Sequence, residues 1–237
     1  MPSEARTDEI RRNLAAVEAR LDAACSAAGR RRDELTLVAI TKTFPADDVR
    51  RLVRLGVTDI GENRDQEAAA KASALSELPI HWHFVGQLQT NKARSVAHYA
   101  DVVHSVDRPR LVHALSAAAE EAGRVLDAFV QISLEPTTAA DDRGGVQPDQ
   151  ACALADAVAD APGLTLAGVM AVAPLGADPA DAFHRLADVA AQIRADHPTA
   201  SAISAGMSGD LEAAVANGAT HVRIGTALLG VRPPRFG

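Results

Sequence analysis

Short apolar runs alternate with longer amphipathic stretches along most of the chain. The first run, at 35–41, is nearly continuously apolar, which is typical of a strand buried on both faces. Further strand-like runs follow at 58–60, 81–85, 101–105, 126–132, 164–170, 202–204 and 221–224. Stretches with helical periodicity or a helix start signal separate them, at 45–55, 64–74, 90–99, 109–122, 148–160, 179–195 and 211–216. The pattern predicts eight strands, each followed by a helix or, after the last one, a helical turn.

This alternation predicts an α/β fold. The chain length of 237 residues is typical of a single (β/α)8 barrel, which would span residues 1–237. An additional helix precedes the barrel at 7–28, with Leu14, Val17 and Leu21 on one stripe and Gly29 as its stop. The alternative is an open doubly wound sheet, but such a sheet usually has a glycine-rich first turn, and this chain has Thr41-Lys42-Thr43-Phe44 there. The barrel is therefore the preferred prediction.

Composition narrows the class of protein. Hydrophobic residues make up 47% of the chain and aromatic residues only 3%, so Ala, Val and Leu must fill the core. The formal net charge is -7 without a basic run, which argues against nucleic-acid or anionic-membrane binding. No signal-peptide pattern and no bilayer-spanning apolar stretch is recognisable, and Cys25 and Cys152 lack metal-ligand spacing. We expect a cytoplasmic protein with free thiols, and a monomer.

One lysine occupies a chemically informative position. Lys42 directly follows the first apolar strand, where the carboxyl end of a parallel strand meets its loop, and such ends are where ligands and chemistry collect. A partly desolvated lysine there has a lowered pKa, and its amine can form a Schiff base with a carbonyl group. The alternative is a lysine that simply reaches solvent at the end of a strand.

The loops after the last two strands are suited to phosphate. In (β/α)8 barrels these loops often bind phosphate, and here they contain Ser208-Gly209 and Gly225-Thr226 at predicted helix starts. The alternative is that Ser208 and Thr226 only cap their helices. Arg223 lies within the last strand, where a guanidinium requires a partner unless it leans to the surface.

Other polar residues are predicted near the barrel. His81 and His83 share a strand face as metal-binding pairs do, but no third ligand is evident nearby in the sequence, so we interpret them as packing or ligand-lining residues. Glu62-Asn63 follows the second strand, with helix capping as the alternative role. The irregular segment 135–147 is a candidate lid or site rim. A strand-end lysine, a phosphate cradle and an inward arginine together describe a site for a phosphorylated aldehyde, either pyridoxal 5'-phosphate (PLP) or a sugar-phosphate intermediate.

Motifs spread over residues 35–232 resemble the pyridoxal phosphate homeostasis protein family, single-domain relatives of the alanine racemase N-terminal barrel. The motifs that carry the resemblance are Val38-Ala39-Ile40-Thr41-Lys42-Thr43, Asp59-Ile60-Gly61-Glu62-Asn63, Trp82-His83-Phe84-Val85-Gly86-Gln87-Leu88-Gln89-Thr90-Asn91-Lys92, Val103-His104-Ser105-Val106-Asp107, Gly206-Met207-Ser208-Gly209-Asp210 and Val222-Arg223-Ile224-Gly225-Thr226-Ala227. The resemblance implies the following roles: a PLP Schiff base on Lys42, phosphate contacts from Ser208, Gly225 and Thr226, Arg223 at the pyridine nitrogen, and Asn63 and His83 lining the site. The chain departs from the family pattern at Ser133, Arg143 and Ala205, around the rim of the expected site.

The resemblance also implies a function in vitamin B6 balance. Members of this family are expected to hold PLP and supply it to PLP-dependent apo-enzymes without robust catalysis. The alternative is a PLP-dependent amino-acid racemase, which needs a base on each face of the substrate. In alanine racemases the second base is a tyrosine from an additional domain of the partner subunit. Tyr99, the one tyrosine of this chain, precedes the fourth predicted strand and is expected near the opposite rim, so we expect a binder rather than an enzyme.

Overall fold

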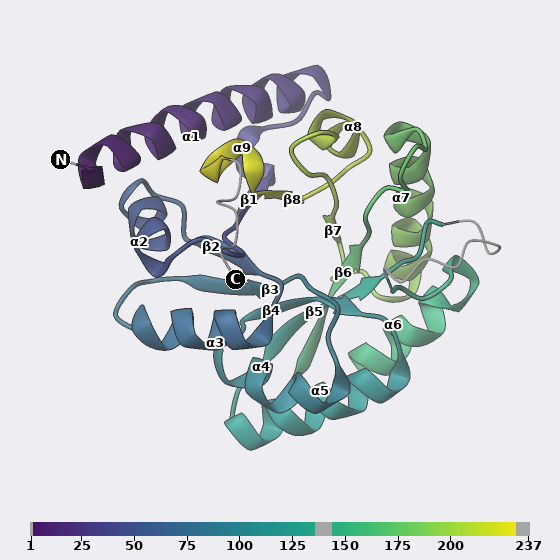
Figure 1. Ribbon diagram of the computed structural model, residues 1–237. Helices are drawn as coiled ribbons and strands as arrows, with labels where there is room; N and C mark the ends of the chain where they lie inside the picture. The colour runs from purple at the N-terminus through teal and green to yellow at the C-terminus, as the bar shows by residue number, and fades with distance from the viewer. Residues whose placement is uncertain (1, 136–143, 231–237) are drawn as a thin grey trace.

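Eight parallel strands close into a barrel in the computed structural model, which describes residues 2–135 and 144–230 (Figure 1). The strands are β1 (Thr36–Ile40), β2 (Asp59–Glu62), β3 (His81–Phe84), β4 (Val102–Val106), β5 (Leu126–Gln131), β6 (Leu164–Met170), β7 (Ala202–Ser204) and β8 (His221–Ile224). They pair in chain order, and β8 returns to β1 through pairs such as Thr36 with His221. The predicted (β/α)8 barrel is confirmed, and each strand lies within about two residues of its predicted position at either end.

Helices follow the strands around the outside of the barrel. They are α2 (Ala46–Arg54), α3 (Asp65–Ala74), α4 (Ala93–Tyr99), α5 (Pro109–Ala122), α6 (Ala151–Ala159), α7 (Pro179–Asp196), α8 (Leu211–Ala216) and α9 (Thr226–Leu229), preceded by α1 (Pro2–Ala27). Short 3-10 turns at Arg32–Glu34, Thr90–Lys92 and Pro148–Gln150 precede β1, α4 and α6. None of the described helices is both long and apolar enough to cross a membrane.

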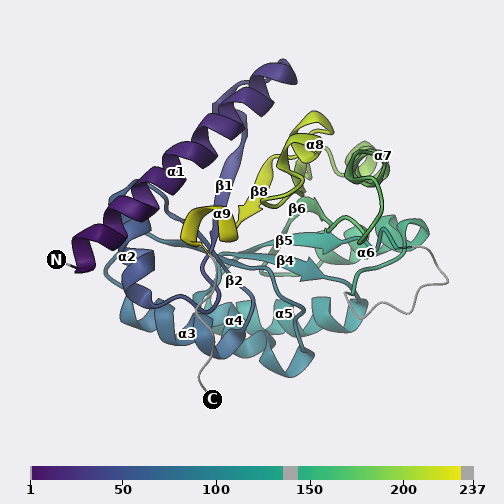
Figure 2. The same ribbon diagram turned by 45° about the horizontal axis from the view of Figure 1, so that its top comes forward.

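The N-terminal helix α1 lies along the outside of the barrel beside α8 and α9 in both views (Figures 1 and 2). Its buried residues Ile10, Leu14, Val17 and Leu21 recur every three or four positions, so they form one apolar stripe. This stripe belongs to the same buried cluster as Leu211 of α8 and Leu228 of α9. The helix therefore packs against the segments that follow β7 and β8, where the phosphate site was predicted.

Most of the apolar core lies between the strands and the surrounding helices. The barrel interior is different, because it combines apolar residues such as Phe129 and Met170 with buried polar side chains. Gly168 is required where β6 approaches β7, since a Cβ there would lie 1.8 Å from the carbonyl oxygen of Ala202. The polar interior side chains lie between the two mouths of the barrel and include His104, Ser204 and Arg223.

Candidate functional site

A cavity of about 360 Å³ lies at the carboxyl ends of the strands. Its walls come from loops and strand ends of β1, β2, β3, β6, β7 and β8. The lining residues are Ile40, Lys42, Phe44, Asn63, Val85, Gly86, Met170, Val172, Met207, Ser208, Gly209, Arg223, Gly225, Thr226 and Gly230. The structure thus brings together every predicted site residue except His83. The apolar walls from Phe44, Met170 and Val172 were not predicted, because apolar residues at strand ends do not differ in sequence from core residues.

Lys42 lies in a tight turn directly after β1 and is partly buried. The turn is closed by the backbone N–H of Phe44, which donates to the carbonyl oxygen of Thr41 at 3.0 Å. Thr43 has a φ of 71°, a left-handed conformation that is unusual for a β-branched residue. Its N–H donates to Oε2 of Glu67 at 3.2 Å, which helps to hold this conformation. Such local strain is commonly found at functional sites, and here it sets the direction of the chain next to Lys42.

The other lysines of the chain, Lys71 and Lys92, are held elsewhere. The Nζ atom of Lys71 forms an ion pair with Glu62 and donates to the carbonyl oxygen of Thr41 at 2.8 Å. Glu62 is fully buried, and burial raises its pKa despite the opposing effect of Lys71. Lys92 lies 3.7 Å from a carboxylate oxygen of Asp65. Lys42 is therefore the lysine of this chain that lines the cavity.

The two loops predicted to bind phosphate meet at one end of the cavity. The Ser208 hydroxyl accepts a hydrogen bond from the N–H of Ala227 at 3.4 Å, so it contacts the first turn of α9 rather than capping α8. Gly225 is the N-cap residue of α9 and Thr226 its first residue, and the first N–H groups of a helix have no partner within the helix. From α1, Arg20 donates to the carbonyl oxygen of Ser208 at 3.0 Å. The two loops thus form one polar end of the cavity, braced from behind by α1.

Arg223 lines the cavity from β8, and its side chain is buried in the barrel. Its guanidinium donates to the Ser204 hydroxyl at 2.6 Å and to the carbonyl oxygen of Ala171 at 2.9 Å. Both acceptors are neutral, and burial lowers the pKa of Arg223 to about 10. That value still leaves the group charged near neutral pH. The prediction that this arginine points inward is confirmed, and it is held by hydrogen bonds instead of a carboxylate partner.

A chain of buried hydrogen bonds connects Arg223 with the opposite end of the barrel. Ser204 Oγ lies 2.9 Å from Nδ1 of His104, and Nε2 of His104 lies 2.9 Å from Nδ1 of His83. The remaining nitrogen of His83, Nε2, lies 3.0 Å from Oδ1 of Asp59. An arginine only donates and an ionised carboxylate only accepts, so we assign donation in one direction, from Arg223 to Asp59. Burial lowers the pKa of both His83 and His104, consistent with two neutral rings in this chain.

The position of His83 corrects the prediction that it lines the binding site. The chain reaches the cavity only just beyond the carboxyl end of β3, at Val85 and Gly86. His83 lies two residues earlier on β3, where it is almost fully buried among the other interior side chains. Gly86 is required at the cavity because a Cβ there would lie 2.1 Å from the carbonyl oxygen of Asn63. Because side chains on one face of a strand are two residues apart, His83 lies one layer of side chains below the mouth of the barrel.

Tyr99 lies in another hollow, together with Trp82, Asp101 and Arg124. Asp101 precedes β4, so this hollow lies toward the amino ends of the strands, as expected for Tyr99 from the sequence. The Tyr99 hydroxyl is buried with no hydrogen-bond partner among the described residues, and burial raises its pKa. Tyr99 does not line the cavity that contains Lys42.

The segment predicted as a lid or site rim is only partly described. Residues 136–143, which include Arg143, lie outside the described residues. The return of the segment runs beside β5, where the N–H of Ser133 donates to the carbonyl oxygen of Val146 at 2.9 Å. None of the described residues of 135–147 lines the cavity.

These features define a class of protein: a (β/α)8 barrel with one lysine in the cavity at its mouth, which also has a polar end formed by the loops after β7 and β8. Consistent with this class, the alanine racemase N-terminal domain family matches residues 8–233. A pyridoxal phosphate homeostasis protein of Mycobacterium tuberculosis is 45% identical, and the match covers 96% of this chain and 94% of that protein. The chain belongs to the pyridoxal phosphate homeostasis protein family, within the alanine racemase N-terminal domain family.

Two solved structures extend the comparison. PipY of Synechococcus elongatus, solved with PLP bound, is 33% identical and superimposes with a TM-score of 0.81, covering 93% of this chain and all of that one. An alanine racemase of Corynebacterium glutamicum shares the fold at 15% identity and a TM-score of 0.69. This match covers 95% of the present chain but only 61% of the racemase chain. The names of the full-length relatives describe a homeostasis protein rather than an enzyme.

Proposed function

We propose that this chain binds PLP covalently through Lys42 and maintains the PLP supply of the cytoplasm by passing the cofactor to PLP-dependent apo-enzymes. The observation that carries this proposal is the position of Lys42. It is the lysine that lines the cavity, and the cavity has a polar end made by Ser208, Gly225 and Thr226. The bound PLP of PipY, a full-length relative, supports the choice of ligand.

The residues around the cavity fit each part of PLP. When bound, PLP supplies an aldehyde that bonds an amine and a ring that withdraws electrons. Lys42 would provide the amine, while Ser208 and the start of α9 would hold the phosphate by hydrogen bonds. Arg223 would face the ring nitrogen, and Asn63 would line the cavity beside the ring. The apolar walls exclude water from the ring.

The same residues support binding without turnover. Arg223 remains charged near neutral pH and can only donate, so it would keep the ring nitrogen unprotonated and weaken electron withdrawal. Two-base racemisation also requires a second proton-transfer group, and Tyr99 lies in a different hollow. We therefore propose that release of the cofactor, not chemistry on an amino acid, is the function of this site.

The test is covalent trapping in full-length protein. PLP should produce an imine absorbance, and borohydride should fix the cofactor on the peptide that contains Lys42, as mapped by mass spectrometry. Lys42→Ala should lose the absorbance and the adduct, whereas Lys92→Met should keep both because Lys92 is bound to Asp65 outside the cavity. An adduct on Lys71 or Lys92 would refute the site.

The same preparation tests the absence of turnover. Chiral chromatography after long incubation of the PLP-loaded protein with L-alanine and other L-amino acids should show D-enantiomer only at background level. Loaded protein should reactivate an apo-enzyme measurably. Steady formation of D-alanine that disappears in Lys42→Ala would replace the proposal with racemase activity.

A further inference from the structure

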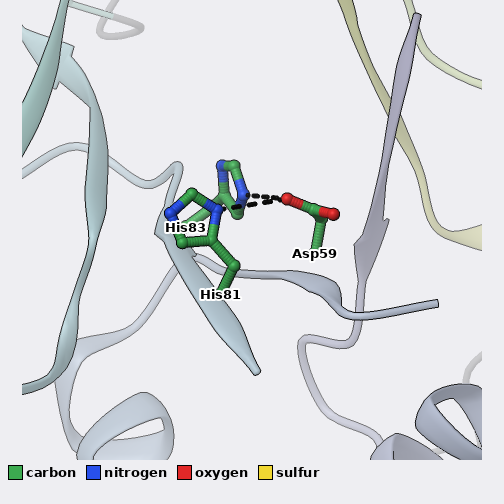
Figure 3. A group of neighbouring side chains, drawn as sticks. All are labelled: Asp59, His81 and His83. Carbon is green, nitrogen blue, oxygen red and sulfur yellow. Dashed lines mark hydrogen bonds and ion pairs between the residues drawn. The ribbon is translucent and has the colours of Figure 1, made fainter. Parts of the chain in front are cut away.

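A group of metal-ligand side chains lies at the mouth of the barrel opposite the cavity. Asp59 is the first residue of β2 and His81 the first residue of β3, and the two are direct neighbours in the sheet register. His83 follows on the same face of β3, because side chains alternate along a strand. Figure 3 shows both imidazole rings directed at one carboxylate oxygen of Asp59. The sequence places His81 and His83 on one strand face but shows no third ligand nearby. In the barrel, Asp59 of the neighbouring strand is that third ligand.

The separations between the ligand atoms suit a small divalent ion. Oδ1 of Asp59 lies 3.2 Å from Nδ1 of His81 and 3.0 Å from Nε2 of His83. All three ligand atoms lie within 4.8 Å of one another. Zinc binds nitrogen and carboxylate oxygen at about 2.0–2.2 Å, which places tetrahedral ligands about 3.3 Å apart. The three side chains therefore need only small movements to surround an ion.

The surroundings of the three ligands resemble those of a metal site with one open position. The side chain of His83 is 1% exposed, while those of Asp59 and His81 are 29% and 47% exposed. The ion would thus have one buried ligand and a path from solvent. The ring of His83 is held from behind by His104, which stacks on Phe129 with ring centroids 4.6 Å apart. Hydrogen bonds of this kind to the second ring nitrogen orient metal-binding histidines.

Charge and hydrogen bonding are also compatible with an ion. The carboxylates of Asp101 and Asp127 lie near enough to act electrostatically on His81, and the charge of Asp101 is partly balanced by Arg124 at 2.6 Å. Binding requires the two ring nitrogens that face Asp59 to lose their protons, and each neutral ring retains one on its other nitrogen. For His83 this is Nδ1, which would then donate to His104, and His104 would donate to Ser204. A hydroxyl oxygen accepts two hydrogen bonds, so Ser204 can serve both His104 and Arg223.

We propose that Asp59, His81 and His83 bind one divalent transition-metal ion, with Zn²⁺ as the best fit and water in the fourth position. Transition-metal ions such as Zn²⁺ bind imidazole nitrogen and carboxylate oxygen, the ligand types present here. Mg²⁺ and Ca²⁺ instead prefer sites made of oxygen ligands alone. The ion would join β2 to β3 at the amino ends of the strands. This site is separate from the cavity that contains Lys42 and does not depend on the proposed function.

The experiment is a titration of untagged full-length protein, stripped with a chelator and then dialysed. Co²⁺ serves as the spectroscopic probe through its visible absorbance, and Zn²⁺ affinity is measured by competition with a chromophoric chelator. We expect one equivalent of metal per chain, with affinity reduced at least tenfold in His81→Gln and in Asp59→Asn. His81 is half exposed, so its replacement should leave the fold intact, which circular dichroism checks.

The matched control is His197→Gln. His197 also pairs with a carboxylate, at 2.7 Å from Asp156, but lacks a third ligand among the described residues. Its replacement should leave stoichiometry and affinity unchanged. The proposal is overturned by a lack of stoichiometric binding at micromolar metal, by unchanged affinity in folded His81→Gln, or by an equal loss in His197→Gln.

Discussion

Replacing Ser204 with alanine should destabilise the barrel strongly for a change of one oxygen atom. Ser204 is fully buried, and its hydroxyl accepts from Arg223 at 2.6 Å and contacts Nδ1 of His104 at 2.9 Å. A hydrogen bond to a charged group contributes about 1.5–3 kcal/mol and a neutral one about 0.5–1.5 kcal/mol. Both partners remain buried after the change, so the losses add to about 2–4.5 kcal/mol in the free energy of unfolding. PLP affinity should also fall, because the guanidinium at the cavity loses one of its two described supports.

The assay is urea unfolding followed by circular dichroism, with Ser116→Ala as the matched control. The Ser116 hydroxyl is also buried but donates a single neutral hydrogen bond, to the carbonyl oxygen of Pro162 at 2.8 Å. That variant should lose about 1 kcal/mol and keep its PLP affinity. The slope of the free energy against urea should stay the same in both, so that midpoints report stability. Equal losses in the two variants would refute the argument that Ser204 holds a buried charge.

Three further results are expected. Replacing both Ser208 and Thr226 with alanine should lower the affinity for PLP well over tenfold but that for dephosphorylated pyridoxal far less, because each hydrogen bond to a charged group is worth about 1.5–3 kcal/mol. An equal loss of affinity for both ligands in equilibrium titrations would contradict the phosphate assignment. Thr43→Gly should stabilise the chain by about 1 kcal/mol in urea unfolding, because it relieves a φ of 71° and removes a buried hydroxyl without a partner among the described residues. The same change should weaken PLP binding. A net destabilisation would show that the turn is not strained. Burial lowers the pKa of His221 to about 4 from an ordinary 6.5. The unfolded chain therefore binds more protons between these values, and stability should fall by roughly 3 kcal/mol for this group as the pH drops from 6.5 to 4. Unfolding midpoints measured with chelator present should show a shallower fall in His221→Asn, and an unchanged fall would exclude this cause.

The order of strands and helices could be predicted from the sequence for a physical reason. Strands of a parallel barrel are covered on both faces, so they appear as short, nearly continuous apolar runs such as 35–41 and 164–170. Because parallel strands all end at the same rim, the residues that follow them were expected together. Lys42, Asn63 and the residues around Ser208 and Thr226 do line one cavity. Local pattern and chain direction were enough for this part of the site.

Contacts between neighbouring strands were decided only by closure of the barrel. The period of two along β3 put His81 and His83 on one face, but strand register determined that Asp59 faces them. The same register placed His83 one layer below the cavity, in contact with His104 rather than with a ligand. Ser208 likewise contacts the first turn of α9 instead of its own helix, because the loops after β7 and β8 meet in space. The sequence by itself determined which residues lie on each strand and its rim, whereas partners on adjacent strands depend on register and closure, which no local pattern encodes.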